Sequence, residues 1–200
     1  LHCHILPGID DGAKSLDMAL AIARSQVADG VGIVACTPHI MPGVYWNTGP
    51  QICAAVQSLQ QTLDTVGIPL RLVDGADNHV APDQIARLRS GGMLTLAGSR
   101  YVLIEPPHNV APARLDEHFF GLMVAGFVPI LTHPERLSWI KTHYDMIQRM
   151  ADRGVWMQIT AGSLAGHSTT PPVCSIKRVV KSTSSACTVS ACTVSACTVA

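Results

Sequence analysis

The strongest constraint in this 200-residue sequence is the alternation of short apolar runs with amphipathic segments. Runs such as VGIVACTPH, YVLIE and FVPILTHP are typical of buried strands, whereas SLDMALAIARSQVADG carries its apolar residues at helical spacing. Nearly continuous apolar strands separated by helices are typical of a parallel sheet covered by helices. The pattern predicts an α/β fold, and the number of such units favours a barrel over an open sheet.

The alternation stops after about Gly166. The chain then becomes rich in Pro, Ser and Thr and ends in three successive copies of SACTV, at Ser185–Val189, Ser190–Val194 and Ser195–Val199. A five-residue period matches neither helix nor strand packing, and Val is the largest apolar side chain it supplies. We predict a single domain over residues 1–166 and a disordered, low-complexity tail over residues 167–200. A tandem nucleotide repeat or a shifted reading frame would explain such a tail.

Charge and hydropathy exclude several classes of protein. The 14 Lys and Arg balance the 14 Asp and Glu, which argues against a nucleic-acid partner held by a basic face. The longest apolar run, FFGLMVAGFVPIL, is shorter than the ~20 residues of a membrane span and is interrupted by Gly and Pro. No secretory signal is visible. We therefore expect a cytoplasmic protein that does not span a membrane.

A potential metal ligand accompanies each of the first five predicted strands. These residues are His2 and His4, His39, Asp77, Glu105 and His133. Side chains at the C-terminal ends of parallel strands meet at one edge of the sheet. A single His or Asp after a strand is usually a cap, but five such positions in succession predict one shared site. Imidazoles combined with carboxylates suit Mn, Zn or Fe.

The N-terminal segment LHCHILPGIDDGA supplies the start of this site. His2 and His4 share one face of an expected strand, because side-chain direction repeats every two residues. Asp10 and Asp11 follow in a loop closed by glycine. From the residues alone, either one aspartate joins the cluster or both serve a turn.

Arg136 follows His133 in the segment THPERLSWI. A guanidinium next to a cationic cluster is favourable when an anion lies between them, and its shape suits a phosphate held by two hydrogen bonds. The alternative is a salt bridge from Arg136 to Glu135 or to another surface acid.

Read in order, LHCHILPGIDDGA, TPH, GAD, IE, THPER and QITAGSLAG resemble the polymerase-and-histidinol-phosphatase (PHP) superfamily. Within it, the chain most closely resembles the manganese-dependent bacterial protein-tyrosine phosphatases of the CpsB/YwqE type, which belong to capsular and exopolysaccharide operons. The resemblance extends from Leu1 to about Gly166. It implies a distorted (β/α) barrel, incomplete at its C-terminal end, with a multinuclear metal centre.

The resemblance also implies roles for individual residues. Arg136 matches a catalytic, phosphate-contacting arginine. The metal ligands that it implies are His2, His4, Asp11, His39, Asp77, Glu105 and His133. Bound Mn would polarise the phosphoryl oxygens and activate a water for in-line attack, so that no Cys nucleophile is required. The implied partner is a phosphotyrosine protein, in particular a membrane-associated bacterial tyrosine kinase that controls polysaccharide export.

Two departures from the family pattern bear on activity. The family usually has Glu where Asp77 stands, and its C-terminal Asp-x-His pair has no counterpart in residues 168–200. Two alternative functions therefore stay open. One is a phosphoesterase of the same superfamily that acts on a small phosphorylated metabolite. The other is a catalytically impaired metal-binding remnant.

Overall fold

The computed structural model describes residues 1–160, 179–183 and 188–189. The helices are α1 (Leu16–Ala28), α2 (Gly49–Thr65), α3 (Gln84–Ser90), α4 (Leu115–Val124) and α5 (Tyr144–Asp152), with short 3-10 turns η1 (Leu96–Gly98) and η2 (Pro134–Arg136). The strands are β1 (Ile33–Cys36), β2 (His39–Ile40), β3 (Arg71–Asp74), β4 (Asp77–His79), β5 (Tyr101–Glu105), β6 (Val128–Thr132), β7 (Trp156–Thr160), β8 (Val179–Thr183) and β9 (Thr188–Val189).

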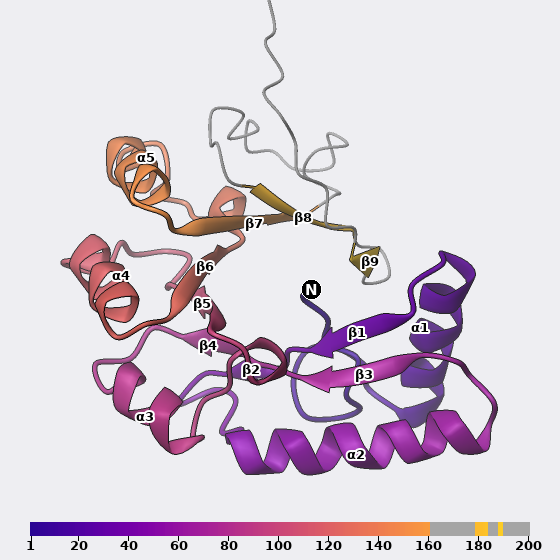
Figure 1. Ribbon diagram of the computed structural model, residues 1–200. Coiled ribbons are helices and arrows are strands. Elements are labelled where there is room, and N and C mark those ends of the chain that lie inside the picture. Colours follow the sequence, from indigo (N-terminus) through magenta and orange to yellow (C-terminus); the bar gives the residue numbers. More distant parts are fainter. Residues whose placement is uncertain (161–178, 184–187, 190–200) are drawn as a thin grey trace, which may run out of the picture.

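The strands form two sheets with parallel pairing. One contains β1 and β3, and the other has the order β2-β4-β5-β6-β7-β8-β9. Only β8 and β9 pair antiparallel among the strands described. Figure 1 shows the strands following one another along a curved wall with the helices on its outside. The predicted α/β class with a parallel sheet is confirmed.

Two expected strands are each divided into two. The run 31–39 becomes β1 and β2, and the run ending at Asp77 becomes β3 and β4. Pro38 has no N–H to give to a ladder, and Gly75 lies where a Cβ would come within 3.1 Å of the Leu96 and Thr37 side chains. The breaks therefore occur side by side, and they leave His39 in register with Asp77 across β2 and β4.

The strand expected at His2–His4 is absent, but the segment is held in place. The amide of Cys3 donates to Thr37 Oγ1 at 2.8 Å, and the amide of Thr37 donates to the Cys3 carbonyl at 2.8 Å. Thr37 lies in the break between β1 and β2. The backbone pairing between Cys3 and Thr37 is therefore not continued by a neighbouring strand. The N-terminal segment is nevertheless fixed beside the strand that leads to His39.

Part of the predicted disordered tail forms strands. β8 pairs parallel with β7, and β9 pairs with β8. The VVKST sequence of β8 is rich in β-branched residues, which favour strands. The disordered tail stays a prediction. Most of the SACTV repeat lies outside the described residues. The boundary at residue 166 stays a prediction.

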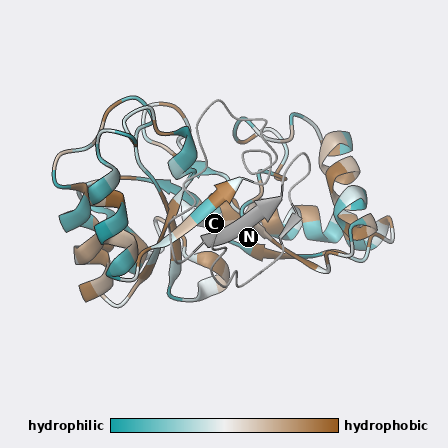
Figure 2. Cartoon of the chain, turned by 90° about the horizontal axis from the view of Figure 1, so that it is seen from above, coloured by the Kyte–Doolittle hydropathy of each residue, from teal (hydrophilic) through white to brown (hydrophobic). Residues whose placement is uncertain are grey.

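The helices carry both hydrophilic and hydrophobic residues, as Figure 2 shows. In α4, Leu115, Phe119 and Leu122 are fully buried, and the helix contacts β6 and α5. Its other face is exposed at Phe120 and Val124. No described helix has the length and apolar content that crossing a membrane requires.

Two neighbouring phenylalanines in α4 test this packing. Phe119 is 0% exposed and Phe120 is 55% exposed. We expect Phe119→Ala to lower the free energy of unfolding by about 3–5 kcal/mol, because it leaves a cavity in the core. Phe120→Ala should change it by less than about 0.5 kcal/mol. Urea unfolding measures both, and equal losses would contradict the orientation of α4.

Candidate metal centre

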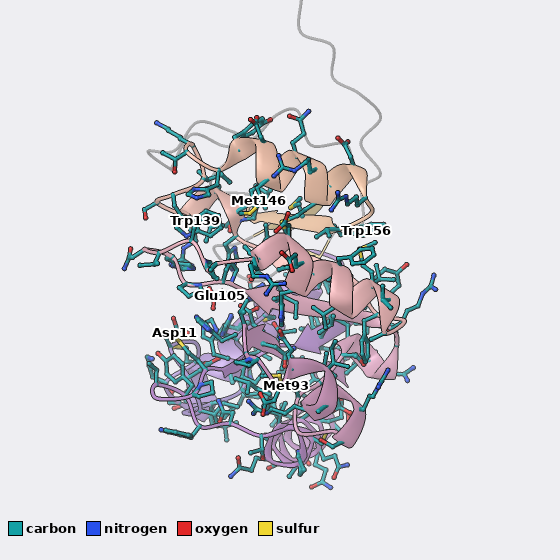
Figure 3. All side chains as sticks on the ribbon, turned by 90° about the vertical axis from the view of Figure 1, so that its left-hand side faces the viewer. Asp11, Met93, Glu105, Trp139, Met146 and Trp156 are labelled. Carbon is teal, nitrogen blue, oxygen red and sulfur yellow. The ribbon has the colours of Figure 1, made fainter. Side chains whose placement is uncertain are left out.

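The predicted ligands come together from five separate parts of the chain. His2 and His4 lie in the N-terminal segment, Asp11 in the loop after it, His39 in β2, Asp77 in β4 and Glu105 at the end of β5. Figure 3 shows Asp11 and Glu105 near each other on one side of the molecule, with Trp156 on the opposite side. The site therefore lies at one end of the curved sheet.

Six of the predicted ligands form three overlapping groups. Within each group, the potential ligand atoms lie within 4.8 Å of one another. The groups are His2, His4 and Asp77; His4, Asp11 and His39; and His39, Asp77 and Glu105. Because His4, His39 and Asp77 each belong to two groups, the geometry suits neighbouring ions that share ligands.

The contact between His2 and His4 shows that the site fits a cation. Their Nε2 atoms are 2.7 Å apart. His2 Nδ1 lies 2.9 Å from Gln158 Oε1, and His4 Nδ1 lies 2.6 Å from Asp10 Oδ2. Both acceptors require a proton on the Nδ1 that faces them, so in the neutral rings both Nε2 atoms present lone pairs. Two lone pairs at this separation repel unless a cation or a proton lies between them.

The part of the site around His39 also contains polar atoms that a cation would satisfy. His39 Nδ1 is 3.2 Å from Glu105 Oε2 and 3.6 Å from Asp77 Oδ2, and His39 Nε2 is 3.5 Å from Asp11 Oδ1. His39 Nδ1 and Asp77 Oδ2 are buried and have no hydrogen-bond partner among the described residues. Buried polar atoms in this state are costly, and metal coordination would satisfy them.

The two adjacent aspartates have different roles, which the sequence had left open. Asp10 is buried, accepts the backbone N–H groups of Gly12 and His39, and contacts His4 Nδ1. The Asp11 side chain is 60% exposed, and its carboxylate faces the rings of His4 and His39. Asp10 therefore orients a histidine, whereas Asp11 is free to act as a ligand.

His133 and Arg136 lie at the edge of the three groups. The ring of His133 is 4.7 Å from that of His2, and its backbone has a left-handed φ of 47°. Such a conformation is uncommon outside glycine and is concentrated at functional sites. Glu135 Oε1 accepts the amide of Thr160 at 2.8 Å, and Thr160 Oγ1 lies 3.1 Å from His133 Nδ1. The end of β7 thus holds this turn.

Arg136 is exposed at the same turn. Within the part of the chain that the structure describes, it forms no ion pair with a carboxylate. Its neighbour Glu135 is buried and contacts the end of β7 instead. The salt bridge considered as an alternative for Arg136 is therefore not observed among these residues, and the guanidinium is available to an anion.

Burial and nearby charges shift the pKa values of the histidines in the cluster in different directions. Burial, together with the nearby His133 and His4, holds the pKa of His2 well below its usual range. Burial and the Arg136 guanidinium lower the pKa of His133 to about 3. Both rings are thus neutral at pH 7, which is the state that binds metal.

The carboxylates act in the opposite direction on His39. Burial lowers its pKa, but Glu105, Asp77 and Asp11 outweigh burial and raise the value to about 9. Burial and the charge of Glu105 raise the pKa of Asp77 to about 7. Against the effect of burial, His108 and His39 hold the pKa of Glu105 well below its usual range. The cluster therefore stabilises a positive charge near its carboxylates.

The buried thiol of Cys36 does not provide a nucleophile at this site. Burial and the nearby Asp74 raise the pKa of the Cys36 thiol to about 12, so it is not a thiolate at pH 7.

Several residues around the cluster were not found from the sequence. They are Gln158 beside His2, Thr132 donating to Asp77 Oδ1, His108 beside Glu105 and Tyr45 stacked on the His39 ring. Gln158 and Thr132 lie in apolar strands, where a single polar residue at a buried position was the available signal. His108 and Tyr45 lie in loops and carried no signal of this kind.

Together, the parallel sheet and the ligand groups at its edge define a class of α/β protein built to hold metal ions. The chain belongs to the capsular polysaccharide synthesis family CpsB/CapC, whose family model matches residues 1–191. This membership confirms the resemblance seen in the sequence.

Similar proteins have names that describe their activity. The chain is 33% identical over 166 residues to the tyrosine-protein phosphatase YwqE of Bacillus subtilis, covering 83% of this chain and 65% of that protein. It is 24% identical over 161 residues to the tyrosine-protein phosphatase CpsB of Streptococcus pneumoniae, covering 80% of this chain and 66% of that protein. The chain thus matches slightly less than two thirds of the length of these relatives.

A solved structure has the same fold. A chain from the crystal structures of YwqE from Bacillus subtilis and CpsB from Streptococcus pneumoniae superposes with a TM-score of 0.78 at 33% identity. The match covers 82% of this chain and 67% of that chain. Those two proteins are described as unique metal-dependent tyrosine phosphatases.

The packing of the Asp loop against His4 yields a test of the site. A Cβ on Gly12 would lie 2.1 Å from the His4 carbonyl oxygen and 2.3 Å from its Cβ. We expect Gly12→Ala to displace His4 and to weaken divalent metal binding on the order of tenfold or more. Isothermal titration calorimetry measures the affinity. Gly32→Ala is the control, because a Cβ there meets nothing within 4 Å, and an equal loss in both variants would contradict the assignment.

Proposed function

We propose that this chain hydrolyses phosphotyrosine in protein substrates with the help of bound Mn²⁺. The observation that carries the proposal is the set of three overlapping ligand groups, with the exposed Arg136 at their edge. Membership of a family with relatives named tyrosine-protein phosphatases supports the substrate class. The donor set of imidazoles and carboxylates suits Mn, with Zn or Fe as the other metals that such ligands accept.

The proposed ligands are the six residues of the three groups together with His133, which the family resemblance implies and whose ring lies beside that of His2. They are His2, His4, Asp11, His39, Asp77, Glu105 and His133. When bound, the metal would supply Lewis-acid polarisation of the phosphoryl oxygens and a water nucleophile at neutral pH.

The residues of the chain then perform distinct tasks. Arg136 binds the phosphoryl oxygens and compensates the negative charge that the phosphate brings to the site. Gln158 and Asp10 keep the Nε2 atoms of His2 and His4 directed into the site. The His39 ring is covered on one side by Tyr45, which limits its movement and its contact with water.

The proposed partner is a membrane-associated bacterial tyrosine kinase of the polysaccharide pathway, with this chain on the cytoplasmic side of the membrane. Membership of the capsular polysaccharide synthesis family supports the pathway. The sequence of residues 168–200 contains no Asp-x-His pair of the kind expected of the family. Most of these residues lie outside the described part of the structure. The proposal rests on the ligands that the described residues supply.

A substrate comparison tests the proposal. The chain loaded with Mn²⁺ should hydrolyse a phosphotyrosine peptide, and EDTA should abolish the activity. Faster hydrolysis of histidinol phosphate than of the peptide would instead favour the small-metabolite phosphoesterase. Metal binding without turnover of either substrate would favour the catalytically impaired remnant. Metal analysis of the protein, run in parallel, identifies which metal is held and how many ions bind.

Arg136→Ala separates phosphate binding from metal binding. We expect KM for a phosphotyrosine peptide to rise about 10–100-fold, because hydrogen bonds to a charged group are lost. The metal content should be unchanged, because Arg136 contacts no ligand carboxylate in the described residues. Arg24→Ala, an exposed arginine on α1, is the control. Parallel loss of metal in Arg136→Ala would show that the arginine is structural.

A further inference from the structure

We propose that His108 is a positioning residue that fixes the orientation of Glu105 at the metal centre. The inference rests on the proposed function only in taking Glu105 as a metal ligand. His108 Nε2 lies 2.9 Å from Glu105 Oε1, while Glu105 Oε2 lies 3.2 Å from His39 Nδ1. One oxygen of the carboxylate is thus bonded outside the cluster, and the other faces into it.

The loop that carries His108 is fixed from the neighbouring connection. The carbonyl of His108 accepts the amide of Ser138 at 2.9 Å and its hydroxyl at 3.0 Å. Trp139 Nε1 donates to the Pro107 carbonyl at 2.9 Å. Figure 3 shows Trp139 and Glu105 on the same side of the molecule. The loop after β5 is therefore attached to the segment that directly follows Arg136.

The sequence makes this loop stiff. Pro106 and Pro107 come directly before His108, and the proline ring fixes φ at each of these positions. The Glu105 carboxylate at the end of β5 and the imidazole three residues later are therefore connected by a chain with little freedom. The imidazole is presented to the carboxylate before any ion binds, so the pairing requires little additional ordering.

The burial of the two partners separates this contact from an ordinary surface pair. An exposed ion pair contributes little, because water competes for both groups. Here the Glu105 side chain is 7% exposed, whereas the His108 side chain is 31% exposed. The carboxylate is thus shielded, and its hydrogen bond limits which oxygen it can give to a metal. The imidazole lies near the surface, and its removal leaves the apolar core intact.

A residue that acts through a ligand should change metal affinity. Partners of metal ligands typically account for 10–100-fold in affinity or activity. We expect His108→Ala to weaken Mn²⁺ binding to the full chain by at least tenfold for one class of ion. His108→Gln should restore most of the loss, because its Nε2 is a donor at a similar reach from the backbone. Ser138→Ala should have a smaller effect, because the Ser138 amide still bonds the loop.

The experiment is a titration of metal-free protein with Mn²⁺, followed by electron paramagnetic resonance and calorimetry. Asn109→Ala, at the exposed neighbouring position, is the matched control and should bind Mn²⁺ like the unmodified chain. Each metal-free variant should still unfold in one cooperative transition, which excludes a general loss of structure. The bound Mn²⁺ spectrum should change in His108→Ala and return in His108→Gln.

Two results would overturn the inference. The first is an Mn²⁺ affinity in His108→Ala within about threefold of the unmodified chain, whatever happens to kcat, because His108 would then act on the substrate or not at all. The second is an equal loss in Asn109→Ala. The titration needs no turnover, so unmodified protein that binds Mn²⁺ without hydrolysing phosphotyrosine would refute the proposed function and leave this test valid.

Discussion

The 2.7 Å approach of His2 Nε2 to His4 Nε2 is the contact on which the rest of the site depends. Two imidazole lone pairs stay this close only when a proton or a cation lies between them. Gln158 from β7 and Asp10 from the loop after the histidines contact the two Nδ1 atoms, which leaves the Nε2 lone pairs facing each other in the neutral rings. These two buried polar residues thus direct the Nε2 lone pairs of both histidines into the metal centre.

The sequence predicted the fold class and the members of the cluster for a physical reason. Apolar runs interrupted by a single His, Asp or Glu leave few interpretations, because a buried strand does not tolerate such residues without a partner. His39, Asp77 and Glu105 could thus be placed at one sheet edge before their distances were known. The divided strands were not predicted, since the effect of Gly75 depends on its packing against Leu96 and Thr37.

The division of labour between Asp10 and Asp11 shows the limit of sequence reasoning. Both are aspartates in one short loop, and only the direction of each side chain decides which one is buried against His4. The same holds for His108, whose role depends on hydrogen bonds from Ser138 and Trp139 to its loop. The spacing of residues in the sequence identifies candidate metal ligands. Which candidate binds a metal and which one orients a neighbour depends on contacts between loops that are distant in the sequence.

The contact between His2 and Gln158 also bears on how the protein folds. These residues are 156 positions apart, so their hydrogen bond joins the N-terminal segment to β7. Closing so long a loop is slow compared with forming the local βα units, and it requires β7 to be already in place. The orientation of His2 by Gln158 is therefore complete only after β7 has formed. A metal ion that needs the oriented His2 ring would thus stabilise the protein after β7 has assembled, and it would not template the earlier steps.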